Sequence, residues 1–153
     1  MDAVRHWSVR HARHLQGIYQ RFEPFITRLD SLWNCIGYAR LEKPVATVER
    51  VVKGFLFDCK MCGRCTLSST GMACPMNCPK RLRNGPCGGV RADGNCEVMP
   101  QMRCVWVEAV EGAGRMQDDV AIHTVQLPLD HSLQGGSAWL RAARENVAQR
   151  APA

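Results

Sequence analysis

Motifs for catalysis and long apolar runs are both missing from this sequence of 153 residues. It contains no Ser/His/Asp set, no paired carboxylates, no Walker loop and no dinucleotide-binding glycine fingerprint, so we do not expect this chain to catalyse a reaction alone. It also lacks an apolar run of membrane-helix length and the apolar core of a signal peptide, so we expect a cytoplasmic protein without a membrane span. In that compartment thiols stay reduced, and clustered cysteines bind metal more often than they form disulfides.

Large aliphatic side chains are scarce between residues 59 and 104. This segment has only Leu67, Leu82, Val90 and Val98, and it is rich in Gly, Pro and Asn. Burial of apolar surface alone cannot offset the conformational entropy that such a segment loses on folding. We therefore expect a group bound to its sulfur atoms to hold it together.

Cysteine is the residue that this segment has in excess. It holds eight of the nine cysteines, which makes two sets of four candidate metal ligands: Cys59, Cys62, Cys65, Cys74, Cys78, Cys87, Cys96 and Cys104. The opening C-x2-C-x2-C run places three sulfurs on one loop, as cubane iron–sulfur clusters require, whereas zinc usually takes two cysteines from each of two loops. We predict two [4Fe-4S] clusters, with two Zn²⁺ in four-cysteine sites as the alternative. The spacing does not decide which cysteines share a site, and our working hypothesis groups Cys59, Cys62 and Cys65 with one later cysteine. We expect the ninth, Cys35, to be a buried structural thiol.

The formal net charge of +6 does not by itself indicate nucleic-acid binding. Residues 59–104 carry seven Lys or Arg against two acidic residues, which would offset the negative charge of metal-bound thiolates. No zinc-finger histidine pair or recognition-helix pattern is present, so we expect no nucleic-acid partner. Bare backbone amides at Gly85, Gly88 and Gly89 are predicted to form part of the cluster environment as donors to sulfur.

The N-terminal segment has apolar residues at steps of three or four, which predicts helices over about 3–22 and 25–38, with a break at Pro24. Residues 41–57 form the next predicted helical piece. In it Pro44 suits the first turn, and Gly54 should end the helix before a short extended run.

Further along the chain we expect a short hairpin that pairs Gly89–Arg91 with Glu97–Met99, a helix over 102–112, and a last helix with Ser137 as its N-cap. The tail also carries apolar residues without obvious local neighbours: Leu127, Leu129, Leu133, Trp139 and Leu140. Such residues often bind another protein, although packing back onto the same domain is an equal alternative.

These expectations define a small, loop-rich, metal-stabilised α+β domain with N-terminal helices and a C-terminal docking tail. Its expected parts are a helical extension (1–40), a cysteine-rich metal- or cluster-binding domain (41–112), a linker (113–126) and a partner-docking tail with a helix (127–153).

The cysteine block CKMCGRCTLSSTGMACPMNCPKRLRNGPCGGVRADGNCEV resembles a known family. It is similar to the cysteine-rich domain named after the C-terminus of methylenetetrahydrofolate reductase, which also occurs as a separate MetV-type small subunit. The resemblance covers about residues 41–112, including Leu41-Glu42-Lys43-Pro44 and Cys104-Val105-Trp106. It continues in the tail, around Gly136-Ser137-Ala138-Trp139-Leu140, where the family more often has Ser in place of Ala138.

The resemblance implies a partner role in one-carbon metabolism. A MetF-type flavin reductase would interconvert 5,10-methylene- and 5-methyl-tetrahydrofolate, with the flavin on that partner only. This chain would pass electrons to or from that flavin as an iron–sulfur subunit, with a further electron-donor protein as a possible partner. The alternative is a structural zinc subunit that stabilises or activates the reductase.

Overall fold

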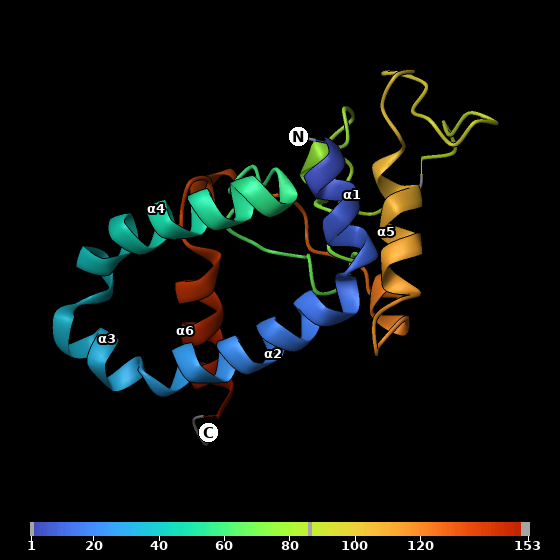
Figure 1. Cartoon of the computed structure of the whole chain (residues 1–153). Coiled ribbons are helices and arrows are strands. Elements are labelled where there is room, and N and C mark those ends of the chain that lie inside the picture. The colour runs from blue at the N-terminus through green and yellow to red at the C-terminus, as the bar shows by residue number, and fades with distance from the viewer. Residues whose placement is uncertain (1, 86, 151–153) are drawn as a thin grey trace.

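The computed structural model describes residues 2–85 and 87–150, and it is mostly helical (Figure 1). The first 57 residues form α1 (Asp2–Arg10), α2 (Ala12–Arg28), α3 (Asp30–Ile36) and α4 (Tyr38–Phe57). Two further α-helices follow the cysteine-rich loops, α5 (Val105–Ala113) and α6 (Ala138–Arg150). Short 3-10 turns lie between them at Pro75–Asn77, Val120–His123 and His131–Leu133. None of the described helices is both long enough and apolar enough to span a membrane.

Both prolines lie inside helices, so the predicted break at Pro24 is wrong. Pro24 lies within α2 and Pro44 within α4, and the chain instead interrupts its helices at His11 and Leu29. Packing explains the difference, because the turn after Pro24 is buried and α2 packs along α6. These contacts outweigh the local cost of a missing N–H.

Helix α4 continues past Gly54, which the sequence had suggested as its end. It stops at Phe57, whose side chain is buried, and Asp58 caps it in the left-handed conformation (φ 50°) with its N–H donating to the Gly54 carbonyl. The predicted extended run over residues 55–57 is therefore the last turn of the helix. The Ser8 hydroxyl donates to the Leu56 carbonyl (2.8 Å), which ties this turn to α1.

The β part of the predicted fold class is not confirmed, because the chain forms no sheet over residues 2–85 and 87–150. Two isolated antiparallel bridges pair Val90 with Cys96 and Asn95 with Arg103. Residues 95 and 96 are neighbours but pair with different segments, residue 96 with Val90 and residue 95 with Arg103. Each bridge therefore stays a single residue pair, and the predicted hairpin does not form a ladder of several pairs.

Two helices follow the sequence closely. Helix α5 begins at Val105 rather than 102, because Cys104 has an extended backbone. Helix α6 starts directly after Ser137, and its N-cap role is confirmed, since the Leu140 N–H donates to the Ser137 hydroxyl (3.2 Å).

Cysteines are part of the hydrophobic core. One buried cluster joins Cys104 and Trp106 to Val9 of α1, and a second joins Cys74 to Phe57 and Leu67. Figure 1 shows α2, α3 and α4 following one another around an open bend that α6 crosses, with α1 and α5 side by side at one end. Residues 61–75 of the cysteine-rich loops are mostly buried, whereas most of residues 87–103 are exposed, and this later part extends outward beside α5 (Figure 1).

Candidate metal centre

The first four cysteines of the block line one small cavity. Cys59, Cys62, Cys65 and Cys74 all face it, together with Lys53 and Glu49 from α4. The loop reaches this arrangement through backbone turns with positive φ at Met61 (49°) and Gly63 (75°). Their convergence agrees with the working hypothesis of a C-x2-C-x2-C triplet completed by one later cysteine.

Backbone amides donate to three of these sulfurs by a common pattern, in which each donor lies two residues after its cysteine. The Met61 N–H donates to Cys59 Sγ (3.4 Å), and the N–H groups of Leu67 and Met76 donate to Cys65 and Cys74. Such bonds favour the thiolate over the thiol, which is the form that binds a metal.

Arg83 supplies a donor to the fourth sulfur. Its side chain is buried, and Nη1 lies 3.6 Å from Cys62 Sγ. The other nitrogens of the same guanidinium donate to the carbonyls of Leu127 (2.9 Å) and Arg64 (3.2 Å), so its position is fixed on both sides. Each sulfur at the cavity therefore has an N–H donor.

A buried lysine gives the cavity a positive charge. Lys53 is 3% exposed, and its ammonium lies 2.6 Å from Oε1 of Glu49, itself 1% exposed. Burial opposes the charged form, but the neighbouring Cys65 and Glu49 raise the pKa of Lys53 above its ordinary value. The ammonium thus stays charged at neutral pH and lies where it offsets thiolate charge.

The thiols of the metal-free cavity have unequal acidities. A hydrogen bond from Cys74 lowers the pKa of Cys59 to about 6, and the same bond raises the pKa of Cys74. Desolvation by the surrounding protein raises the pKa of Cys65. Its side chain is nevertheless exposed, because it lines the cavities on both sides. One proton shared by two sulfurs is typical of thiols held close together.

The C-terminal segment closes over this loop. The Gly135 N–H donates to the Met61 carbonyl (2.8 Å), and the Gln134 side chain donates to the Lys60 carbonyl (2.7 Å). A Cβ placed on Gly63 would lie 2.4 Å from the Leu133 carbonyl oxygen, so only glycine fits there.

The predicted partner-binding residues differ in their exposure. Leu127 is 59% exposed, Leu129 and Leu133 are half-buried, and Leu140 is 1% exposed against its own chain. Trp139 packs edge-on against Phe22 and lies over the Lys53 ammonium. Partner binding by this set stays a prediction, although the segment also packs on its own domain.

A network of hydrogen bonds connects the tail to α4. The Glu49 carboxylate accepts from the Ser137 hydroxyl (2.7 Å) and the Trp139 N–H (3.2 Å), while the Ser137 N–H donates to Glu42 (2.6 Å). Three residues of the site were not predicted from the sequence: Glu49, Lys53 and Arg83. Glu49 and Lys53 are spaced i, i+4 on the buried side of a helix, and this pattern could have indicated these two residues.

The other four cysteines are less closely gathered. Cys78, Cys96 and Cys104 are buried and Cys87 is exposed, and both Cys87 and Cys96 lie within electrostatic reach of Lys80. In the part of the chain that is described, no three His, Cys, Asp or Glu side chains, those of the first cavity included, surround a single point closely enough to hold one metal ion. A second site on these cysteines stays a prediction.

The three predicted glycine donors have different surroundings. The Gly89 N–H donates to Cys87 Sγ (3.4 Å), which repeats the two-residue pattern of the first site. Gly85 lies against the Trp106 ring, where a Cβ would be 2.4 Å from it, and Gly88 has φ 71° with open space around it. Cys35, which we expected to be buried, is exposed on α3, a helix in which no residue is buried.

The donor set of the first cavity fits a thiolate-bound metal group. Four soft sulfur ligands, an N–H donor to each and one buried cation are the features that such a group requires of its protein shell. Both a four-iron cluster and a tetrahedral zinc ion accept four cysteines.

A comparison with protein families identifies the class of this chain. Residues 38–132, more than half of it, match the model of the family described as methylene-tetrahydrofolate reductase C terminal, so the chain belongs to that family. The matched region begins with α4 and includes all eight cysteines of the block. Searches of curated proteins and of solved structures found no significant match.

Proposed function

We propose that this chain is an iron–sulfur subunit of a methylenetetrahydrofolate reductase complex. It would relay electrons to or from the flavin of a MetF-type catalytic partner, which interconverts 5,10-methylene- and 5-methyl-tetrahydrofolate. Family membership supports the association with a reductase. The observation that carries the metal role is the convergence of Cys59, Cys62, Cys65 and Cys74 on one cavity with a donor to every sulfur.

In this proposal these four cysteines hold one [4Fe-4S] cluster, and Cys78, Cys87, Cys96 and Cys104 hold a second. A cluster bound there supplies one-electron transfer, which complements the hydride chemistry of a flavin. The amide donors and Arg83 stabilise negative charge on the sulfurs, and such bonds raise the reduction potential of a cluster. Lys53 acts in the same direction, because its ammonium is buried beside the cavity.

The protein scaffold contributes rigidity to this site. Glu49 holds the Lys53 ammonium on one side and the start of α6 on the other, so helix α4 and the tail are fixed to the same carboxylate. The tail then binds the backbone of the loop between Cys59 and Cys65. We place the protein in the cytoplasm, where its cysteines stay reduced for metal binding.

Zinc is the alternative occupant, because N–H donors to thiolates suit a structural zinc site equally well. In that case the chain would stabilise or activate the reductase without carrying electrons. The iron–sulfur and zinc forms of the protein would differ in iron content, sulfide content and colour, so chemical analysis and an absorption spectrum distinguish them.

The test is metal and acid-labile sulfide analysis of protein purified without oxygen, followed by mixing with the reductase. We expect about eight irons and eight sulfides per chain, a brown absorption that bleaches on reduction, and reduction of the partner's flavin by the reduced subunit. A Cys35→Ser variant is the matched control and should keep its full metal content. About two zinc ions in a colourless protein would overturn the electron-transfer role.

A further inference from the structure

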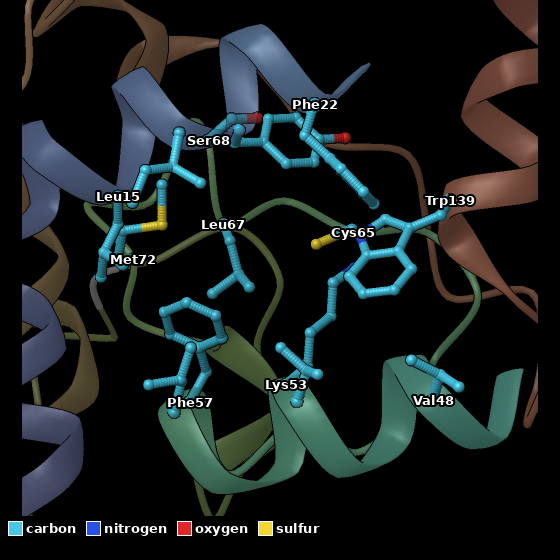
Figure 2. Close-up of a pocket in the computed structure, with 14 residues that line it drawn as sticks. Leu15, Phe22, Val48, Lys53, Phe57, Cys65, Leu67, Ser68, Met72 and Trp139 are labelled. Carbon is cyan, nitrogen blue, oxygen red and sulfur yellow. The ribbon is translucent and has the colours of Figure 1, made fainter. Parts of the chain in front are cut away.

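An apolar cavity of about 440 Å³ opens between α2, α4 and α6, next to the metal site (Figure 2). Its walls include Leu15 and Phe22 of α2, Val48 of α4, Leu67 and Met72 of the cysteine block, and Trp139 of α6. The proposed function leaves this cavity without a role. Its size and lining are those of a site that receives side chains or a ligand from outside.

The apolar surface continues outward from the cavity along α4. Val48, Val51, Val52 and Phe55 are spaced as one helix face, and all four are exposed, Val51 by 66% and Phe55 by 65%. On the opposite wall, α2 exposes Ile18 by 63% and Phe25 by 58%. A contiguous exposed apolar surface of this kind marks an interaction site.

The charges beside this surface have one sign. On α2 the exposed ionisable side chains are Arg13, His14, Arg21 and Arg28, and on α4 they are Arg40, Lys43 and Arg50. The acidic residues of the two helices face inward instead, because Glu49 is buried, Glu42 binds Ser137 and Glu23 accepts from Asn146 of α6. The groove therefore has apolar walls, and the two helices that form them expose only basic charge, which we call its basic rim.

We propose that the groove between α2 and α4 binds an amphipathic helix of the reductase partner, with apolar anchors every three or four residues and acidic residues on its flanks. The groove shape matches helix-in-groove recognition, in which such anchors fill an apolar cleft. The basic rim supplies the charge complementarity that selects and orients an acidic-flanked helix. This inference rests on the proposed function, since it names the surface by which the reductase would be bound.

Two other occupants fit the surface less well. A second copy of this chain would bring the same basic rim against itself, and like charges across an interface are repulsive. A lipid bilayer would contact the exposed residues of α4 but would leave the hollow of about 440 Å³ between the helices unfilled.

The position of the groove relates it to the metal site. Cys65 lines the groove and also the cavity that holds the other three cysteines, and Figure 2 shows Cys65 and Lys53 at the inner end between Leu67 and Trp139. A helix bound in the groove would lie against the metal site through Cys65. The partner would then contact the protein where its sulfur ligands are most accessible.

The experiment measures the dissociation constant for the methylenetetrahydrofolate reductase of the same organism. It compares the unchanged protein with three variants: Val51→Glu, Phe55→Glu and Arg50→Glu. Val51 and Phe55 lie at the outer edge, so their replacement leaves the core and the metal ligands intact. Val110→Glu on α5 is the matched control, because Val110 is similarly exposed (58%) and lies on another helix. Circular dichroism and metal content confirm that each variant is folded.

We expect the dissociation constant to rise about tenfold or more in the three groove variants and to stay unchanged in Val110→Glu. Added salt should weaken binding of the unchanged protein more than that of Arg50→Glu. Equal binding by the unchanged protein and all the variants would overturn the groove assignment alone. No binding by the unchanged protein would instead contradict the proposed function. Loss of binding to phosphatidylglycerol vesicles in the groove variants, with reductase binding intact, would assign the face to a membrane and overturn the proposal.

Discussion

Replacing Lys53 by Met tests the buried charge pair beside the metal cavity. The substitution keeps the approximate length of the side chain but removes the ammonium that lies 2.6 Å from Glu49. The Glu49 carboxylate, 1% exposed, would keep its bonds from Ser137 and Trp139 but lose its cation. The cysteines of the cavity would lose the same neighbouring positive charge.

The expected loss follows from the burial of both partners. Removal of one member of a buried ion pair costs about 3–5 kcal/mol in unfolding free energy, and the two remaining donors to Glu49 place Lys53→Met near the lower end. A domain of this size loses about 2–4 °C of melting temperature per kcal/mol, so we expect a decrease of about 6–12 °C. The raised pKa of Lys53 means that its stabilising effect is complete below the ordinary lysine pKa and is lost only as the pH rises through the higher folded value. The deficit should therefore not decrease between about pH 6 and 9.

The assay is urea unfolding of the protein as purified without oxygen, under reducing conditions, with metal content measured in parallel. Lys60→Met is the matched control, because the Lys60–Asp58 pair has side chains 48% and 28% exposed and should contribute less than about 1 kcal/mol. The double variant Glu49→Gln/Lys53→Met should be more stable than the sum of the two single losses implies, since the remaining partner is no longer charged. A loss below about 1 kcal/mol in Lys53→Met, equal to that of the control, would refute the role of the pair.

Three further outcomes are expected. Gly63→Ala combines a positive φ of 75° with a 2.4 Å contact to Leu133, so it should cost at least about 2 kcal/mol of stability in thermal unfolding. Gly37→Ala is the control, because Gly37 has a positive φ but open space, and it should cost about 1 kcal/mol. Equal losses in the two variants would contradict the close packing of the tail on Gly63. Ser137→Ala removes the cap of α6 and a donor to a buried carboxylate, and it should lower stability by about 1–2 kcal/mol in urea unfolding, whereas no change would show that the tail is not anchored there. In metal-free protein the pKa of Cys59 is lowered to about 6, so Cys59 should be the first cysteine alkylated by iodoacetamide as the pH rises from 5 to 8. If the alkylation rate of Cys59 increased only near pH 8.5, Cys59 would not share a proton with Cys74.

The cysteine block carried most of what could be predicted from the sequence. Its motif indicated the family that the comparison then showed, whereas the metal site that its spacing indicates stays a prediction. The N-cap at Ser137 was also predictable, because a serine before an amphipathic run has a local mechanism. These features depend on residues close together in the chain.

The features that were missed depend on contacts between distant segments. Pro24 stays inside α2 because α6 packs along that helix, and no local rule contains that information. Glu49 and Lys53 lie in a helix whose sequence alone does not show that the tail returns to cover them. The predicted hairpin is reduced to one bridge, with the Glu97 N–H donating to the Gly89 carbonyl, because neighbouring residues of one segment bridge to two others.

The most direct test of the central claim is the iron and sulfide content of single and double cysteine variants. If Cys59, Cys62, Cys65 and Cys74 bind one cluster, Cys59→Ser and Cys74→Ser should each lose about half of the iron, and the double variant should lose no more than either alone. Cys59→Ser combined with Cys96→Ser should lose nearly all of it. Additive losses within the first pair, or full iron retention in Cys74→Ser, would contradict the assignment of these four cysteines to one metal centre.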